Sequence, residues 1–184
     1  MIYSPAEDSW LLEKEITEFL KRIRNKKRIK ILDMGSGSGI QARACIDAGA
    51  DRTQVLCGDI DENAVRILKS QGLNSIQTDL FSNIKNQTKF DLIIFNAPYL
   101  PEDKQEDKES KLTTTAGQEG YELILKFLDQ AKSHLNKKGS IILLFSSLSK
   151  PKIILDYAKK IKYTYKKLGE QKLFFEKLFV YELK

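Results

Sequence analysis

The stretch IKILDMGSGSG, residues 29–39, joins a short apolar run to a turn that contains three glycines. The apolar run predicts a buried strand over residues 29–33, and apolar residues at helical spacing predict a helix over 40–48. Glycine adopts positive φ without strain and lets the backbone approach a ligand closely. Parallel sheets bind ligands at the carboxyl ends of their strands, so this turn is a candidate binding loop.

The turn matches neither of two well-known nucleotide-binding fingerprints. No Gly-Lys-Ser/Thr follows it, as a Walker P-loop would require. Counted from Gly35, the dinucleotide fingerprint would need glycine or alanine at the position of Ile40. The turn alone could bind a ligand or serve only to reverse the chain, and the neighbouring residues are needed to distinguish these two roles.

Strand-like and helix-like patterns alternate along most of the chain. Further strands are predicted over residues 54–59, 75–78, 90–95 and 140–145, with helices between them. This alternation predicts an α/β fold with a parallel, doubly wound sheet. The tail alternates differently, around residues 161–165 and through 174–183, which predicts an antiparallel hairpin with its turn at Gly169-Glu170.

Two regions lie outside this alternation. Residues 1–28 predict an N-terminal helical segment, with Ser4-Pro5-Ala6-Glu7 as its capping box. Residues 97–120 form a long irregular stretch, and loops of this length in compact domains are usually functional or disordered. We expect an active-site loop there, within a single domain that spans residues 1–184.

The composition excludes several classes of protein. The formal net charge is +6, from 31 Lys and Arg against 25 Asp and Glu, and 41% of residues are hydrophobic, which is ordinary for a globular domain. No apolar run approaches the length of about 20 residues that a membrane helix needs. Two cysteines cannot build a four-thiolate zinc site, so we expect no metal and a cytoplasmic location. The positive charge permits a nucleic-acid partner, although scattered lysines are more typical of a solvated surface.

Acidic residues follow the second and third predicted strands. Asp59 ends the second strand, 20 residues after Gly39, where a carboxylate can accept both ribose hydroxyls of a nucleoside. The competing role for Asp59 is helix capping, but Asp61 is better placed for that task. Asp79 follows the third strand and is either an acceptor for an adenine amino group or a plain turn residue.

The segment Asn96-Ala97-Pro98-Tyr99 directly follows the fourth predicted strand. The Asn96 side-chain carbonyl and the next backbone carbonyl can accept both hydrogens of a planar NH2 group. Two such acceptors stabilise the positive charge that grows on this nitrogen when it is alkylated. Tyr99 can present its ring face to a cationic methyl donor. The alternative is a simple Asx-Pro turn.

In this order the motifs resemble class I S-adenosylmethionine methyltransferases, and more closely the HemK/PrmC-like release-factor glutamine methyltransferases of the short archaeal and eukaryotic branch. The resemblance extends along nearly the whole chain. Its most discriminating part is the opening, because generic methyltransferases lack it. The matching segments are Tyr3-Ser4-Pro5-Ala6-Glu7-Asp8-Ser9, the glycine turn, Gly58-Asp59-Ile60-Asp61, Thr78-Asp79-Leu80, Asn96–Tyr99 and Ala116-Gly117-Gln118-Glu119-Gly120.

This resemblance implies a Rossmann-like, seven-stranded, mostly parallel sheet that ends in the antiparallel hairpin. It implies S-adenosylmethionine as cofactor and, as methyl acceptor, the side-chain amide of the glutamine in a release factor's Gly-Gly-Gln motif. The implied catalytic residues are Asn96, Ala97, Pro98 and Tyr99. The implied cofactor contacts are Ser9, Asp33, Gly35, Gly37, Gly39, Asp59, Ile60, Asp79, Leu80 and Asn96.

The chain departs from the family at two points. Ala97 stands where the family usually has the first proline of Asn-Pro-Pro-Tyr, although alanine still supplies the carbonyl acceptor. Only residues 1–28 precede the first predicted strand, so we expect no counterpart of the helical domain with which bacterial relatives grip the release factor. The short branch pairs instead with a small zinc-binding activator protein. We expect such a partner at the third strand, around residues 74–78, as an added strand on an open sheet edge.

Other activities fit the same motifs. An adenine amino group in RNA or DNA has a similar nitrogen geometry, but the sequence shows no target-recognition domain. A protein lysine is a weaker alternative acceptor. A non-catalytic scaffold is a further alternative, which Ala97 favours and the intact Asp59 and Asn96 oppose.

Overall fold

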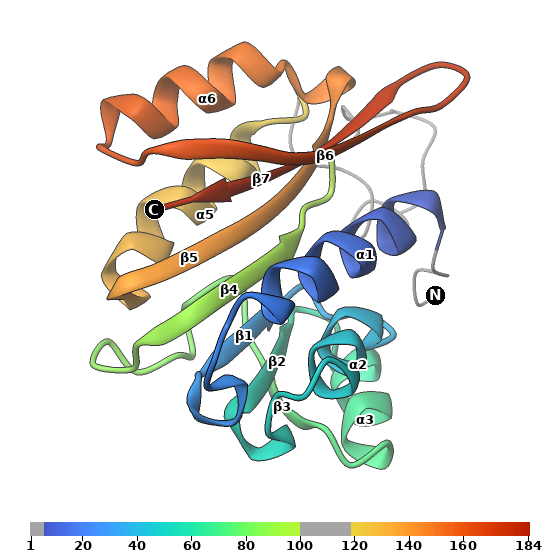
Figure 1. Ribbon diagram of the computed structural model, residues 1–184, viewed down its shortest axis with the longest axis vertical. Coiled ribbons are helices and arrows are strands. Elements are labelled where there is room, and N and C mark those ends of the chain that lie inside the picture. Colours follow the sequence, from blue (N-terminus) through green and yellow to red (C-terminus); the bar gives the residue numbers. More distant parts are fainter. Residues whose placement is uncertain (1–5, 100–118) are drawn as a thin grey trace.

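The computed structural model describes residues 6–99 and 119–184 (Figure 1). Within them lies one sheet of seven strands in the order β3-β2-β1-β4-β5-β7-β6. The strands are β1 (Ile31–Met34), β2 (Val55–Asp59), β3 (Asn74–Gln77), β4 (Phe90–Asn96), β5 (Leu135–Ser146), β6 (Tyr165–Lys172) and β7 (Lys177–Leu183). The helices are α1 (Glu7–Lys21), α2 (Ile40–Asp47), α3 (Glu62–Ser70), α5 (Glu122–His134) and α6 (Pro151–Lys160), with short 3-10 turns η1 (Lys26–Arg28), η2 (Arg52–Gln54) and η3 (Ser147–Ser149).

The five strands from β3 to β5 are parallel, and β7 is antiparallel to both of its neighbours. The predicted α/β class, with a doubly wound sheet that ends in an antiparallel hairpin, is therefore confirmed. Helices cover both faces of the sheet, so the side chains on both faces of a central strand are buried. The central strands are therefore continuous apolar runs, without alternating polar residues.

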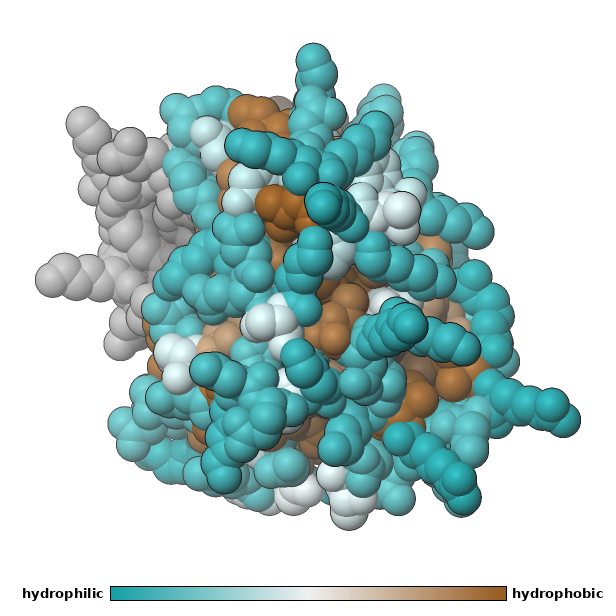
Figure 2. Space-filling view, turned by 90° about the vertical axis from the view of Figure 1, so that its left-hand side faces the viewer, coloured by the Kyte–Doolittle hydropathy of each residue, from teal (hydrophilic) through white to brown (hydrophobic). Residues whose placement is uncertain are grey.

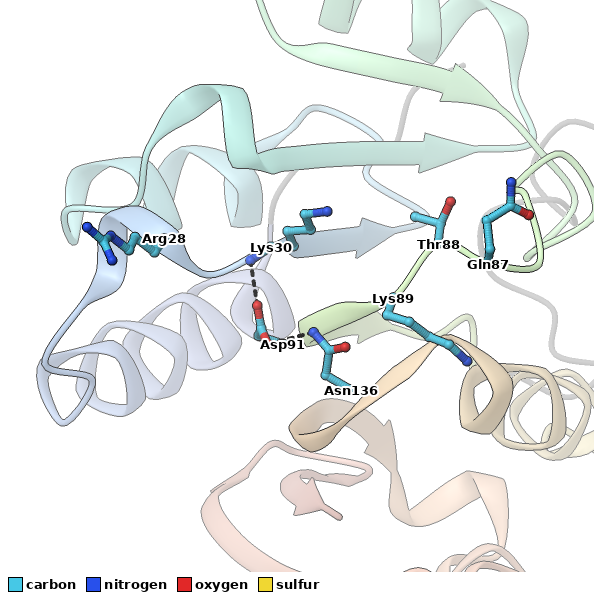
Figure 3. Close-up of a pocket in the computed structure, with 7 residues that line it drawn as sticks. All are labelled: Arg28, Lys30, Gln87, Thr88, Lys89, Asp91 and Asn136. Atoms are coloured by element: carbon cyan, nitrogen blue, oxygen red, sulfur yellow. Dashed lines mark hydrogen bonds between the residues drawn. The ribbon is translucent and has the colours of Figure 1, made fainter.

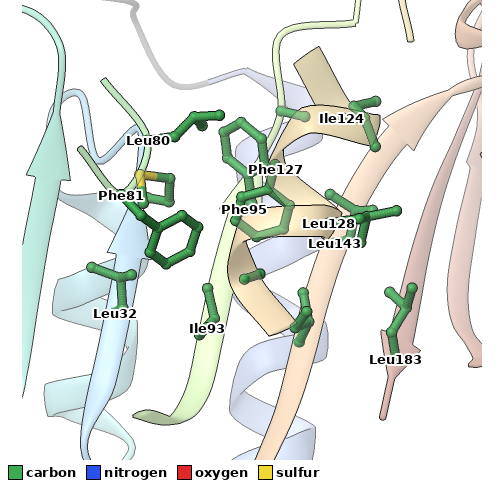
Figure 4. Close-up of a cluster of buried hydrophobic side chains, with 14 of the residues drawn as sticks. Leu32, Leu80, Phe81, Ile93, Phe95, Ile124, Phe127, Leu128, Leu143 and Leu183 are labelled. Atoms are coloured by element: carbon green, nitrogen blue, oxygen red, sulfur yellow. The ribbon is translucent and has the colours of Figure 1, made fainter. Parts of the chain in front are cut away.

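Successive residues of each central strand serve opposite faces of the sheet. Ile93 and Phe95 of β4 belong to the cluster that α5 and α6 cover. The side chain of Phe127, from α5, is fully buried in this cluster (Figure 4). Ile94, between them, packs on the other face with α1 and α2, whose buried residues include Leu12. The sheet is thus held between two apolar layers, which fixes the edge where its carboxyl ends meet.

The predicted turn of the C-terminal hairpin is wrong. Gly169 and Glu170 lie inside β6, where Gly169 pairs with Val180 after a register shift. A Cβ atom at Gly169 would lie 2.6 Å from Glu15 Oε1, so this glycine lets α1 pack closely on the strand and does not reverse the chain. The reversal comes later, at Phe174 and Phe175.

Three further boundaries can be compared with the sequence. α1 begins at Glu7 with Ala6 as its N-cap, and Ser4 and Pro5 of the predicted capping box lie outside the described residues. Asp61 caps α3, as predicted, by accepting from the backbone of Asn63 at 2.8 Å. β5 begins directly after α5, earlier than predicted. Residues 100–118 of the predicted loop lie outside the described residues, and no helix in the described part is long and apolar enough to cross a membrane.

Candidate active site

The carboxyl ends of β1, β2 and β4 meet at one edge of the sheet. Met34 at the end of β1 pairs with Gly58 on one side and with Phe95 on the other. The glycine turn, Asp59 and Asn96 follow these three positions by one residue each. Parallel pairing therefore brings together three motifs that are far apart in the sequence.

The backbone of the glycine turn is tied to β2. The amides of Gly35 and Ser36 both donate to the Gly58 carbonyl, at 2.7 and 3.1 Å. The turn's three glycines have positive φ, at +64° for Gly35, +51° for Gly37 and +81° for Gly39. Only glycine adopts three such conformations so close together without strain, which explains the spacing.

Asp59 is held by the backbone of the same turn. Its Oδ2 accepts from the Gly37 amide at 2.7 Å and its Oδ1 from the Asp61 amide at 2.9 Å. The side chain is buried, and burial raises the pKa of the carboxyl group while the two amides oppose the rise. Each carboxylate oxygen keeps acceptor capacity for another hydrogen.

Asp33 is a buried acid at the same edge. It is 1% exposed, and its Oδ2 has no hydrogen-bond partner among the described residues. Burial raises the pKa of this carboxyl group to about 7. A buried oxygen without a partner is costly for the isolated protein, and a donor or cation from a ligand would satisfy it.

Asn96 is oriented by a residue that the sequence analysis did not single out. Its Nδ2 donates to Oδ2 of Asp8, from α1, at 3.1 Å. Because a carboxylate only accepts, this bond leaves Asn96 Oδ1 as the free end of the amide. Asn96 Oδ1 is buried and has no partner among the described residues. Asp8 lies in the opening motif, but no local pattern indicates a partner 88 residues away.

Four other predicted residues pack against neighbouring elements in this structure. Ser9 is buried, and its carbonyl accepts from Gln41 Nε2 at 2.9 Å, which fastens α1 to α2. Ala97 is buried in the core cluster, and the Tyr99 carbonyl accepts from Ser149 Oγ at 3.2 Å. Pro98 lies between them and is partly buried.

The remaining predicted cofactor residues lie after β2 and β3. Ile60 is 44% exposed, which is unusual for an isoleucine next to a buried aspartate. Asp79 forms an ion pair with Lys126 of α5 at 3.1 Å. Leu80 has a φ of +49°, and its carbonyl accepts from Thr78 Oγ1 at 2.7 Å.

A shallow pocket lies elsewhere on the molecule (Figure 3). It is lined by Arg28, Lys30, Gln87, Thr88, Lys89, Asp91 and Asn136. Asp91 accepts from the Lys30 amide at 2.9 Å and from Asn136 Nδ2 at 2.7 Å, at the amino ends of β1 and β4. Figure 2 shows that the left-hand side of the molecule in Figure 1 is largely hydrophilic, with apolar side chains between the polar ones. The pocket is thus at the opposite edge from Asn96 and has no part in the candidate active site.

The sheet order, the glycine turn after β1, the acid that ends β2 and the asparagine that ends β4 define a class I methyltransferase. Members of this class use S-adenosylmethionine as methyl donor. The chain belongs to the family described as methyltransferase small domain, which matches residues 16–169.

Relatives are similar to this chain over different shares of their length. A candidate protein N5-glutamine methyltransferase of Methanocaldococcus jannaschii is 33% identical, over 97% of this chain and 89% of that protein. The eRF1 methyltransferase catalytic subunit mtq2 of Schizosaccharomyces pombe is 26% identical, over 75% of this chain and 69% of its own. A release factor glutamine methyltransferase of Rhodopirellula baltica is 27% identical, and the match covers only 53% of it.

Solved structures share the fold. The E. cuniculi Mtq2-Trm112 complex, responsible for methylation of the eRF1 translation termination factor, matches with a TM-score of 0.78 and 21% identity, over 100% of this chain and 98% of the other. The T. thermophilus 16S rRNA methyltransferase RsmC, in complex with AdoMet and guanosine, matches with a TM-score of 0.68 and 18% identity, over 98% of this chain and 44% of the other.

Proposed function

We propose that this protein methylates the side-chain amide nitrogen of a glutamine in a peptide chain release factor, with S-adenosylmethionine as donor. The observation that carries the proposal is Asn96 Oδ1, a buried acceptor without a partner among the described residues, held in one orientation by Asp8. The relative from Methanocaldococcus jannaschii supports a glutamine as the acceptor, and the relative from Schizosaccharomyces pombe supports a release factor, eRF1, as the substrate.

The residues at the edge fit the proposed cofactor. Asp59, fixed by two backbone amides, would accept the ribose hydroxyls, and the glycine turn leaves room for the backbone to approach. Asp33 offers the oxygen that a cationic amino group would satisfy. Asp79 and Leu80 would face the adenine, and Ile60 would cover one side of it. When bound, S-adenosylmethionine supplies an electrophilic methyl group on a positively charged sulfur.

The chemistry at the acceptor is limited by the poor nucleophilicity of an amide. Its nitrogen lone pair is delocalised, and alkylation gives that nitrogen a positive charge. Asn96 Oδ1 and the Ala97 carbonyl would accept its two hydrogens and so stabilise this charge in the transition state. No general base is required, because the alkylated amide is acidic enough to lose a proton to water afterwards.

We further propose a small activator at β3. Among the described residues this strand pairs only with β2, and its four residues are partly or fully exposed. An open edge of this kind accepts a strand from another chain. The solved complex of Mtq2 with Trm112 supports a partner protein, its place at β3 rests on the open edge, and from the resemblance we expect it to be small and to bind zinc. An activity on a translation factor also favours a cytoplasmic location.

The acceptor can be tested by competition between substrate classes. The protein, alone and with an activator, would be incubated with radiolabelled S-adenosylmethionine and three acceptors: an intact release factor, ribosomal RNA and a lysine-rich protein. We expect label in the release factor alone, and its loss when the Gly-Gly-Gln glutamine is replaced by alanine. Label in the RNA would instead favour the adenine alternative.

A further inference from the structure

Two phenylalanines at the end of the β6–β7 hairpin are almost fully exposed. Phe174 is 91% exposed and Phe175 86%, whereas the other exposed large apolar side chains range from 39% to 56%. The two rings contact each other edge to face, with centroids 4.6 Å apart. Burying a phenylalanine is worth about 1.5–3 kcal/mol, and the isolated chain gains little of it here.

The turn that carries them is tight. The Leu173 amide donates to the Glu176 carbonyl at 2.8 Å, which leaves Phe174 and Phe175 as the two central residues. Glycine, asparagine and aspartate are the residues that two-residue hairpin turns favour at these positions. Neither phenylalanine has positive φ, so this turn is not of the I′ or II′ type and does not require those residues, but it has no preference for aromatic ones either. Turn formation therefore gives no reason for an aromatic pair.

The base of this turn is fastened to the body of the protein. The Lys177 amide donates to Ser147 Oγ at 2.9 Å, and Ser146 Oγ donates to the Glu176 carboxylate. Leu173 packs against the core cluster beneath α1. The two rings are thus presented on a pre-organised support, which lowers the entropic cost of binding.

The turn projects from the same edge of the sheet as the candidate active site. Asn96 pairs with Leu144, and Leu144 pairs with Val180 of β7. From Val180 the chain leads back through Lys177 to the turn, so the rise along the strand and the two strand spacings place the turn about 20 Å from Asn96. Figure 1 shows the hairpin projecting beyond the sheet on the side where α1 begins. β3 lies at the other end of the strand order, so an activator there leaves this turn free.

Two lysines flank the aromatic pair. Lys172 and Lys177 are directly paired across the hairpin, both are exposed, and among the described residues neither forms an ion pair. Like charges directly opposite each other destabilise a hairpin. Lys172 lies on the edge strand β6, where a lysine is explained by protection against aggregation. Lys177 lies on β7, an interior strand, so the same explanation does not apply to it.

We propose that these four residues, Lys172, Phe174, Phe175 and Lys177, form a docking tip that inserts into an apolar pocket with an acidic rim on the release factor. This inference rests on the proposed function. A glutamine amide is a common group, and selection of one glutamine needs contacts remote from the reacting nitrogen. Only a macromolecular substrate reaches both Asn96 and a tip about 20 Å away. Exposed aromatic residues are typical anchors of such interfaces.

The test compares a large and a small substrate. The variant Phe174→Ser/Phe175→Ser would be assayed, with activator, on the intact release factor and on a short peptide that contains Gly-Gly-Gln. Ile67→Ser, which removes a 40%-exposed apolar side chain on α3, is the matched control. We expect kcat/KM for the intact factor to fall about 10–100-fold in the double variant, through KM. The double variant's kcat/KM for the peptide, and the control variant's kcat/KM for both substrates, should stay within about twofold of the wild-type values. A twofold change is well below the effect of losing one hot-spot contact.

Each other outcome overturns the docking tip. An unchanged KM for the intact factor would show that the tip does not contact it. An equal loss on the peptide would show that the tip supports the active site itself. Loss of binding to RNA or to anionic vesicles, with release-factor kinetics intact, would assign the tip to another partner. If the wild type methylates no release factor at all, the proposed function fails, and the docking proposal fails with it.

Discussion

Asn96 Nδ2 donates a hydrogen bond to Asp8 Oδ2 over 3.1 Å, which joins the end of β4 to the first turn of α1. Asp8 is itself fixed, because its Oδ1 accepts from the Ser9 amide at 2.6 Å. The bond selects one of the two orientations of the Asn96 amide and directs its oxygen away from Asp8. The helix at the start of the chain thus orients the group that we expect to bind the acceptor amide.

Asp8→Asn should reduce catalysis more than cofactor binding. An amide at position 8 can donate as well as accept, so Asn96 would be free to turn its NH2 group toward the acceptor. We expect kcat to fall by about 10–100-fold, less than for the complete loss of a transition-state acceptor. Single-turnover kinetics and calorimetric titration of S-adenosylmethionine would separate the two effects. Glu7→Gln is the matched control, since Glu7 is exposed on the same turn. Wild-type kcat in Asp8→Asn would show that this bond has no role in the reaction.

Asp33→Asn should stabilise the protein without cofactor, in a pH-dependent way. The folded pKa is about 7, above the ordinary value of 3.8, so between these values the folded state binds more protons than the unfolded state. Wild-type stability therefore falls as pH rises from 4 to 7 and then levels off, because an ionised group is being buried. The variant has no ionisable group at this position. The difference in free energy of unfolding between the variant and the wild type should therefore increase from pH 4 to pH 7. Urea denaturation at pH 4, 6 and 8 would measure it; an advantage that does not change with pH would contradict this assignment.

Asp59→Asn should weaken S-adenosylmethionine binding. It removes a charged acceptor, whose hydrogen bonds contribute about 1.5–3 kcal/mol, so affinity should fall about 10–100-fold. Asp61→Asn is the control, because it removes a nearby charge without removing a helix cap. Asp61 accepts a hydrogen bond from the Asn63 amide, and asparagine is as good an N-cap residue as aspartate. Calorimetry on both variants checks the assignment. Equal affinities for the cofactor would show that Asp59 serves only to hold the glycine turn.

Gly39→Ala and Gly37→Ala should affect different properties. A Cβ atom at Gly39 would lie 2.7 Å from Leu68 Cδ2, whereas at Gly37 the nearest atom is a backbone oxygen at 4.0 Å. Both alanines would have to adopt positive φ, at a cost of about 1 kcal/mol each, and Gly39→Ala adds a clash in the core. Thermal unfolding should therefore show a clearly larger loss for Gly39→Ala. Gly37→Ala should mainly reduce cofactor affinity, because its new methyl group faces open space in the binding turn.

The sequence allowed prediction of those parts of the structure that depend on local pattern. The glycine turn, the buried strands and the acid at Asp59 have signatures within a few residues, and parallel topology then brings them to one edge. Gly169 was wrongly assigned to a turn. A glycine is needed there because Glu15, on a helix far away in the sequence, packs closely against it, and the local sequence does not distinguish such a contact from a turn. Asp8 was missed for the same physical reason, since its partner Asn96 is brought to it only by tertiary folding. The early start of β5 likewise depends on the pairing of Leu135 with Phe90.

Methylation of a glutamine with the help of Asn96 can be tested by residue-level mass spectrometry of a release factor. The factor would be incubated with S-adenosylmethionine, the activator, and either the wild-type protein or Asn96→Ala. We expect a single added methyl group on the side chain of the Gly-Gly-Gln glutamine. Asn96→Ala should form this product about 10²–10³-fold more slowly while it still binds the cofactor. A methyl group on any other residue, or equal rates for the two proteins, would contradict this proposal.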